Sequence, residues 1–311
     1  MIAIRQRMAG PLARGIERVR ALGRSPGARR LAGAGVVLSG DRLWHRAAAL
    51  GKTFLVQEVL REPVVFTDRF GVRYLLYPSD AVYESYLNDG YYERAEQTFC
   101  SRYVKPGMTV FDVGASHGYY TLLFAKLVRE GFVHAFEAEA WNFHRLNTNL
   151  ALNGVENVLA RRAAIFERTG EVELNVFPHE LYGWHTLGAP SMEVDGRPVL
   201  PAERQTVPAL TLDGYCEEHE IERIDLLKLD VEGAEVEALR GADRLLREGR
   251  ISCIVFEVSE AMVEGMGHEP ADVVDLVRST GLTVHELADD GTLRPAAGRP
   301  ARNFQNFVAL A

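Results

Sequence analysis

The chain has 311 residues, 47% of them hydrophobic, and a formal net charge of −8 at pH 7. That length supports one large domain with an appendage, and no run of 18 apolar residues indicates a membrane-spanning helix. The three cysteines are widely spaced and form no CxxC pair. Their spacing argues against a disulfide framework or a zinc site and favours a reducing, cytoplasmic compartment.

Charge is distributed unevenly along the chain. Residues 1–53 hold eleven Arg and Lys against two acidic residues, a net of about +9, so the remainder carries about −17. An acidic body argues against a nucleic-acid groove. Residues 1–60 show helical spacing of apolar residues with arginines between them, which predicts a basic helical segment. Two interpretations stay open: it contacts anionic lipid at the inner face of a membrane or an acidic partner, or it packs on its own domain or a second copy of the chain.

Residues 61–103 have a different pattern. Two short apolar runs, 64–67 and 72–77, flank Asp68-Arg69-Phe70-Gly71 and predict a hairpin. A lead-in helix is predicted to follow and to close at Lys105-Pro106-Gly107. It carries aromatic residues that either belong to the core or form a wall of a ligand pocket: Tyr83, Tyr86, Tyr91, Tyr92 and Phe99.

Residues 104–311 alternate between strand and helix patterns, which predicts an α/β fold with a mostly parallel sheet and helices on both faces. Helices are expected to follow Gly118, over Glu139–Leu152, after Gly233 and over Ala271–Thr280. An added strand is expected over Glu171–Phe177. The seven predicted sheet strands are Thr109–Val113, Phe132–Glu137, Val158–Ala163, Ile224–Asp230, Ile251–Glu257, Leu282–Glu286 and Phe304–Leu310.

Residues 178–205 interrupt this alternation. They are rich in Gly and Pro and contain Tyr182 and Trp184. A loop of this length is usually functional or unstructured. A lid that faces a substrate and a simple insertion are both consistent with the pattern.

The first predicted strand ends in a motif typical of a nucleoside-binding site. Asp112 is followed by a loop with glycines at 114 and 118, where glycine allows the backbone to approach a ligand and the next helix to pack closely. Glu137 ends the next strand, 25 residues after Asp112, and can accept hydrogen bonds from two ribose hydroxyls. The GxxxG spacing, in place of GxGxxG, favours S-adenosylmethionine over a dinucleotide, because no pyrophosphate has to be bound.

A second motif, Lys228-Leu229-Asp230-Val231-Glu232-Gly233-Ala234-Glu235, makes the chain resemble the FkbM family of methyltransferases. The resemblance covers most of residues 104–257. It implies a Rossmann-like class I methyltransferase fold, S-adenosylmethionine as cofactor, and methyl transfer to hydroxyl oxygens of sugars and natural products. Ser116, His117 and Ala138 replace the Asn, Ile and Pro that the family commonly has, which we interpret as a changed loop.

Sheet geometry assigns the remaining roles, because ligands of an open α/β sheet lie beyond the carboxyl ends of its strands. The alanines that follow the third strand, at 163 and 164, are expected to form an apolar floor for adenine. The predicted cofactor-binding residues are Asp112, Gly114, Ala115, Ser116, Gly118, Glu137, Ala138 and Ala164. The predicted catalytic residues are Asp230, Glu232, Lys228 and His117, with His185 as a further imidazole.

A hydroxyl acceptor needs a base or a metal ion to remove its proton. Asp230 and Glu232 are the leading carboxylates, although Glu232 alternatively favours a positive helix N-terminus. Lys228 is expected on the same face as Asp230, to pair with it or to orient the acceptor. Asp230 and Glu257 together form a hypothetical magnesium site. No other metal site is predicted, because His179-Glu180 and His185 lack helical spacing.

These features predict a cytoplasmic O-methyltransferase that acts on a small molecule, natural product or glycan. Three alternatives stay open: an N-methyltransferase, a nicotinamide-dependent dehydrogenase, and a non-catalytic module that retains the fold to bind a partner. The missing GxGxxG motif argues against the dehydrogenase. Acidic residues at each expected strand end argue against the non-catalytic module.

Overall fold

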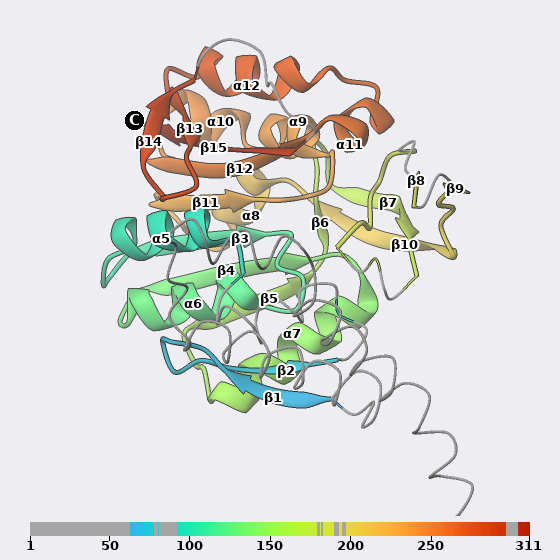
Figure 1. Cartoon of the computed structure of the whole chain (residues 1–311). Helices are drawn as coiled ribbons and strands as arrows, with labels where there is room; N and C mark the ends of the chain where they lie inside the picture. Colours follow the sequence, from blue (N-terminus) through green and yellow to red (C-terminus); the bar gives the residue numbers. More distant parts are fainter. Residues whose placement is uncertain are drawn as a thin grey trace, which may run out of the picture. The chain divides into compact units, whose positions relative to one another are not determined.

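The computed structural model describes residues 63–77, 80, 92–178, 181, 183–189, 193–194, 197–296 and 304–311 (Figure 1). All of them belong to the second of two compact units, Thr53–Ala311, the first being Met1–Lys52. Within these residues no helix is both long and apolar enough to cross a membrane. The predictions for the basic segment 1–60 and for Tyr83, Tyr86, Tyr91, His179, Glu180 and Tyr182 lie outside the described residues.

A mostly parallel sheet of eight strands forms the centre of this unit, in the order β14-β13-β15-β12-β11-β3-β4-β5. Strands β12, β11, β3, β4 and β5 are parallel neighbours, and β15 runs antiparallel between β12 and β13. The strands are β3 (Thr109–Val113), β4 (Phe132–Glu137), β5 (Val158–Arg162), β11 (Leu226–Leu229), β12 (Cys253–Ser259), β13 (Thr283–Leu287), β14 (Leu293–Pro295) and β15 (Phe304–Leu310).

The predicted α/β sheet is confirmed, but the predicted number of seven strands is wrong. The eighth strand, β14, pairs antiparallel with β13 at the edge of the sheet. It is three residues long and mostly exposed. Because it buries no alternating apolar side chains, its sequence carries no strand pattern.

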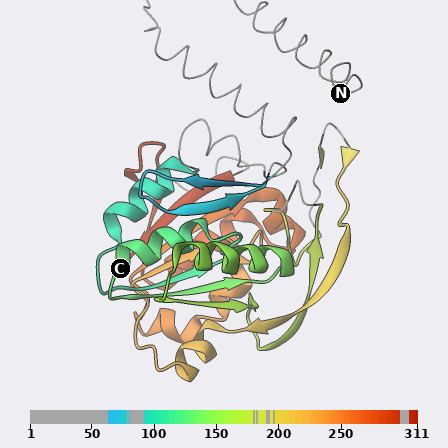
Figure 2. The ribbon, with the colours of Figure 1, turned by 90° about the horizontal axis from the view of Figure 1, so that it is seen from below.

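Helices cover both faces of the sheet (Figure 2). On one face, apolar residues of α5 (Arg94–Tyr103), α6 (Tyr119–Val128) and α7 (Ala140–Asn153) share a core with alternate residues of the strands. On the other face the core includes α8 (Leu212–Glu218), α9 (Glu235–Arg240), α10 (Asp243–Arg247) and α12 (Pro270–Ser279). Short α11 (Glu260–Gly265) follows β12 directly. The three cysteines are free and buried in these two cores.

Two smaller β elements flank the sheet. The hairpin of β1 (Val64–Thr67) and β2 (Arg73–Leu76) packs on α7, where Asn149 and Asn153 accept hydrogen bonds from the β2 backbone. A second sheet combines β6 (Ala164–Ile165), β10 (Glu203–Leu210) and β7 (Gly170–Val176). The sequence predicts β7 but neither β10 nor the short pair β8 (Glu193–Val194) and β9 (Arg197–Pro198), which lie in or next to the segment interpreted as a loop.

Strand alternation places three charged residues on the face covered by α5 and α6. Asp112 and Lys228 are opposite each other in the register of β3 and β11, and Glu257 has the same orientation in β12. Their neighbours Val113, Leu229 and Val258 point into the opposite core. Because these charged residues stand near the carboxyl ends of parallel strands, they meet at one edge of the sheet.

The contact between the ends of β3 and β11 requires a glycine. Gly114 has φ +84°, and a Cβ atom there would lie 1.7 Å from the carbonyl oxygen of Asp230. The Asp230 amide in turn donates to the carbonyl of Val113 at 3.0 Å. The two loops that follow these strands are therefore in direct contact, although more than 100 residues separate them in the sequence.

We predict that Gly114→Ala destabilises the protein by about 3 kcal/mol or more, the sum of a left-handed backbone and a steric overlap. The matched control is Gly154→Ala at the end of α7, where φ is +62° and no atom lies within 4 Å of the added Cβ. That variant has only the backbone strain, about 1 kcal/mol. Urea unfolding of both variants measures the difference. Equal losses would show that the close contact does not constrain the fold.

Candidate active site

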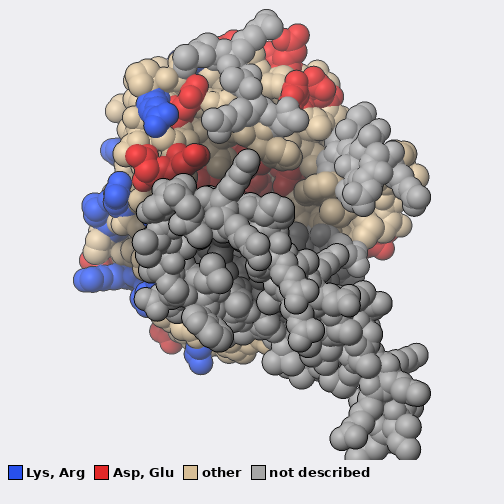
Figure 3. Space-filling view, in the orientation of Figure 1, with Lys and Arg blue, Asp and Glu red and all other residues tan. Residues whose placement is uncertain are grey.

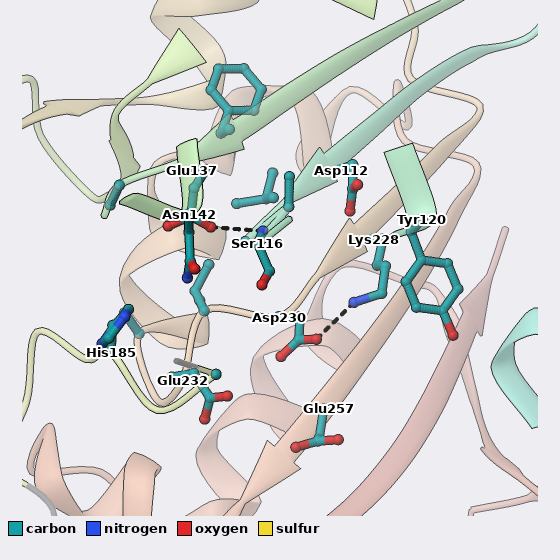
Figure 4. Close-up of a pocket in the computed structure, with 18 of the residues that line it drawn as sticks. Asp112, Ser116, Tyr120, Glu137, Asn142, His185, Lys228, Asp230, Glu232 and Glu257 are labelled. Atoms are coloured by element: carbon teal, nitrogen blue, oxygen red, sulfur yellow. Dashed lines mark hydrogen bonds and ion pairs between the residues drawn. The ribbon is translucent and has the colours of Figure 1, made fainter. Parts of the chain in front are cut away.

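A cavity of about 460 Å³ opens at the carboxyl ends of β3, β4, β11 and β12 (Figure 4). The segment 181–187 lines another side of it. Thr186 holds this segment in place: its backbone pairs with Asn175 of β7, and its Oγ1 donates to the carbonyl of Glu232 at 2.6 Å. The predicted site residues that line the cavity are Asp112, Gly114, Ala115, Ser116, His117, Glu137, Ala138, Ala164, His185, Lys228, Asp230, Glu232 and Glu257.

Gly118 does not line the cavity but shapes its loop. A Cβ atom there would lie 2.7 Å from Leu146 Cδ1 of α7, so its close contact is with this helix and not with the strand. The amides of Gly114 and Ala115 donate to the carbonyl of Phe136, which ties the loop to β4. Ser116 adopts a left-handed conformation with φ +48°. Such a backbone is unfavourable for a residue with a Cβ atom and often marks a functional loop.

Glu137 links this loop to the start of α7. Its Oε2 accepts from the Ser116 amide at 2.7 Å, and its Oε1 accepts from the Glu139 amide at 2.8 Å. Each carboxylate oxygen has a second lone pair, so two further donors can bind, as a ribose diol requires. Burial raises the pKa of Glu137 to about 7, although the two backbone hydrogen bonds oppose that shift.

Beside Glu137 the cavity has an apolar wall. Ala164, Leu174 and Val207 of the second sheet form a small core, against which Ala138 and Leu187 pack. Ala163 and Ile165 also line the cavity here. The wall therefore provides the flat apolar surface expected for an adenine ring, and it extends beyond the two alanines predicted from the sequence. We call this end, from Ser116 to the wall, the cofactor pole.

The opposite end of the cavity contains an ion pair between the buried Lys228 and the partly exposed Asp230. Lys228 Nζ lies 2.7 Å from Asp230 Oδ2 and 4.6 Å from the centre of the Tyr120 ring. The Tyr120 hydroxyl donates to Glu96 of α5 at 2.9 Å. Burial lowers the pKa of Lys228, but Asp230, Glu96 and other carboxylates outweigh that effect and hold it well above its usual value. Lys228 is therefore a permanent cation.

Glu232 points toward the same end of the cavity (Figure 4). Its backbone is left-handed, with φ +52°. The amides of Val231 and Gly233, in the loop before α9, donate to Glu235 Oε1 at 3.2 and 3.4 Å. Glu235, and not Glu232, thus holds this loop, and α9 itself has no side-chain cap. We call the end formed by Glu93, Lys228, Asp230, Glu232 and Glu257 the acceptor pole.

Three of these carboxyl groups favour the protonated form. Burial and the charge of Glu96 raise the pKa of Glu93 well above its usual value. Burial, followed by the charges of Asp230 and Glu257, raises the pKa of Glu232 well above its usual value. Burial and the charge of Asp230 raise the pKa of Glu257 to about 8. Within the described part of the chain, no group of three or more His, Cys, Asp or Glu side chains is placed to hold a metal ion. Magnesium bound by Asp230 and Glu257 would take its remaining oxygen ligands from water or the substrate.

The two histidines at the cavity have different surroundings. Burial and the nearby Arg145 lower the pKa of His117 to about 3. His185 Nδ1 accepts from the Phe177 amide at 3.1 Å, which assigns the proton of the neutral ring to Nε2, 4.0 Å from Glu139. His117 is therefore a weak base, whereas His185 is held in place by its hydrogen bond to the Phe177 amide.

Several cavity residues carry no motif in the sequence. Glu93, directly before α5, lines the acceptor pole, and Glu96 of α5 lies close enough to raise the pKa of Lys228. Trp184 lines the cavity from the segment after β7. The one signal for the two glutamates is their spacing of three residues, which places them on one side of the predicted lead-in helix.

The fold and this cavity match those expected for a class I methyltransferase fold. The chain belongs to the FkbM family: the profile of the "Methyltransferase FkbM domain" matches residues 112–282. The family assignment confirms the resemblance identified in the sequence and argues against the nicotinamide-dependent dehydrogenase.

Individual proteins are more distant. Methyltransferase sdnD of Sordaria araneosa is 30% identical over 161 residues, 43% of this chain and 60% of that protein. Methyltransferase 1 of Beauveria bassiana (strain ARSEF 2860) is 28% identical over 145 residues, 43% of this chain and 58% of that protein. The chain thus spans less than two thirds of either relative. The crystal structure of methyltransferase FkbM from Methylobacillus flagellatus KT aligns with a TM-score of 0.42 at 14% identity, covering 66% of this chain and 44% of that one.

We predict that adenosylhomocysteine affinity falls about tenfold per unit as the pH drops below 7. The pKa of Glu137 is raised to about 7, so the carboxylate predicted to accept the ribose hydroxyls is lost below that pH. Calorimetry between pH 5 and 8 measures the effect. Glu137→Gln is the control: it should bind weakly at every pH and lose the dependence. A flat affinity profile in the unsubstituted protein would remove Glu137 from the ribose site.

Proposed function

We propose that the protein is an O-methyltransferase that transfers the methyl group of S-adenosylmethionine to a hydroxyl of a small molecule, natural product or glycan. The observation that carries the proposal is the Asp230 carboxylate at the acceptor pole, fixed by Lys228 at 2.7 Å. A hydroxyl gives up its proton reluctantly, so an oxygen acceptor needs such a base, whereas a neutral amine needs none.

The cofactor pole suits the three parts of S-adenosylmethionine. The apolar wall accommodates adenine, Glu137 accepts the ribose hydroxyls, and the buried Asp112 faces the methionine part. Asp112 Oδ2 accepts from Thr121 at 2.5 Å, while its Oδ1 is buried without a hydrogen-bond partner. An unpartnered buried oxygen is costly, and an ammonium donor from the ligand would satisfy it. When bound, the cofactor supplies an electrophilic methyl group.

Asp230 is the best candidate for the group that receives the acceptor's proton. Its ion pair with Lys228 requires the ionised carboxylate and engages Oδ2, and among the described residues Oδ1 has no hydrogen bond. Lys228 itself stays protonated, while Glu232 and Glu257 favour the protonated form. Lys228 thus orients the base. A divalent cation between Asp230 and Glu257 could also assist removal of the acceptor's proton, but it would need further ligands.

We predict that Asp230→Asn lowers kcat by about 10²- to 10⁴-fold, the usual contribution of a general base, and leaves adenosylhomocysteine affinity within twofold. The loss is confined to turnover because the cofactor pole keeps all its contacts. Transfer of a labelled methyl group to fractionated cell extract measures turnover, and calorimetry measures affinity. Asp243→Asn is the matched control, since Asp243 pairs with Arg247 on an exposed helix. An Asp230→Asn variant with full activity would exclude Asp230 as the base.

A further inference from the structure

The cavity has a strongly negative lining. Lys228 is the one Lys or Arg among the described residues that line it. Acidic side chains are visible in the hollow at the centre of the face shown in Figure 3. Six carboxyl groups line the cavity: Glu93, Asp112, Glu137, Asp230, Glu232 and Glu257.

Lys228 does not neutralise this charge. It already pairs with Asp230 and lies over the Tyr120 ring. Among the described residues, Glu232 and Glu257 have neither an ion pair nor a hydrogen bond to their side chains. Asp112 and Glu137 belong to the part of the cavity assigned above to the cofactor, and Glu137 already accepts two backbone hydrogen bonds. Glu232 and Glu257 therefore add negative charge at the acceptor pole that no described side chain balances.

The ionised carboxylates in this cavity repel one another, because a buried cavity screens their charges less than bulk water does. Protonation of Glu232 and Glu257 reduces the repulsion, as their raised pKa values indicate. A positively charged ligand would remove the repulsion directly. A neutral polyol can satisfy the hydrogen bonds but leaves the charge, and an anionic acceptor such as a sugar phosphate would increase it.

The positive group is better matched by an organic ammonium than by a metal ion. The carboxylates are too dispersed to form a three-ligand group within the described residues. Tyr92 and Trp184 line the same cavity and present aromatic rings. Carboxylates combined with aromatic faces are the usual surroundings of an organic cation.

We infer that the acceptor is a hydroxylated molecule that carries a protonated amine, as in an amino sugar or an aminocyclitol. Glu232 and Glu257 hold the ammonium group and so position the hydroxyl next to Asp230. This inference rests on the proposed function and deepens it by naming the substrate class. The inference concerns only which acceptor the cavity binds, so a binding measurement can test it without measuring methyl transfer.

The test uses three probes that share a ring and a hydroxyl and differ in charge: 4-aminocyclohexanol, cyclohexane-1,4-diol and 4-hydroxycyclohexanecarboxylate. Their affinities for the full chain, saturated with adenosylhomocysteine, are measured by calorimetry at neutral pH. We expect the amine to bind at least tenfold more tightly than the diol and the carboxylate to bind most weakly. Glu232→Gln and Glu257→Gln should each reduce the preference for the amine at least threefold.

Glu264→Gln is the matched control, because Glu264 is exposed on α11 and does not line the cavity. It should keep the full preference. Equal affinity for the amine and the diol, or a preference that survives in both cavity variants, overturns the inference while the proposed function stands. Failure of adenosylhomocysteine itself to bind is a separate outcome that overturns both.

Discussion

The organisation of the site depends on the close contact between Gly114 and Asp230. This contact joins the loop after β3 to the loop after β11, at the point where the chain reverses its order across the sheet. Strands added after β3 extend the sheet one way through β4 and β5, and β11 begins the other half. Open α/β sheets bind ligands at such a switch point. Because Gly114 has no Cβ atom, the loop after β3 and the carboxylates after β11 can line the same cavity.

Strand alternation provides the second constraint. Asp112 and Lys228 are buried, and Glu257 is partly buried, on the face that α5 and α6 cover, where apolar residues would pack at lower cost. The polar contacts continue through Tyr120 to Glu96 on α5. Two opposing effects therefore meet at this edge: burial disfavours each charge, and Lys228 compensates for only some of the carboxylates. The remaining negative charge is what a ligand can use.

The sequence predicts the central part of this arrangement well. The sequence shows Asp112 and Glu137 as acidic residues at or near the ends of two apolar strand patterns, and Gly114 follows the first of them. It also predicts the end of α7 at Gly154 from the Asn-Gly pair. β10 could not be predicted, since it contains Pro208 and exposes alternate residues on the second sheet. The different roles of Glu232 and Glu235 could not be predicted either, because both follow the same strand. Glu232 has a left-handed backbone and lines the cavity, whereas Glu235 accepts hydrogen bonds from the loop amides.

The most direct test of this account is a crystal structure of the full chain with adenosylhomocysteine. The account predicts ribose hydroxyls within hydrogen-bonding distance of Glu137, adenine on the wall formed by Ala164 and Leu174, and the sulfur atom directed toward Asp230. A nucleoside bound outside this cavity would contradict it. So would a complex in which the loop at Gly114 has moved away from the Asp230 carbonyl.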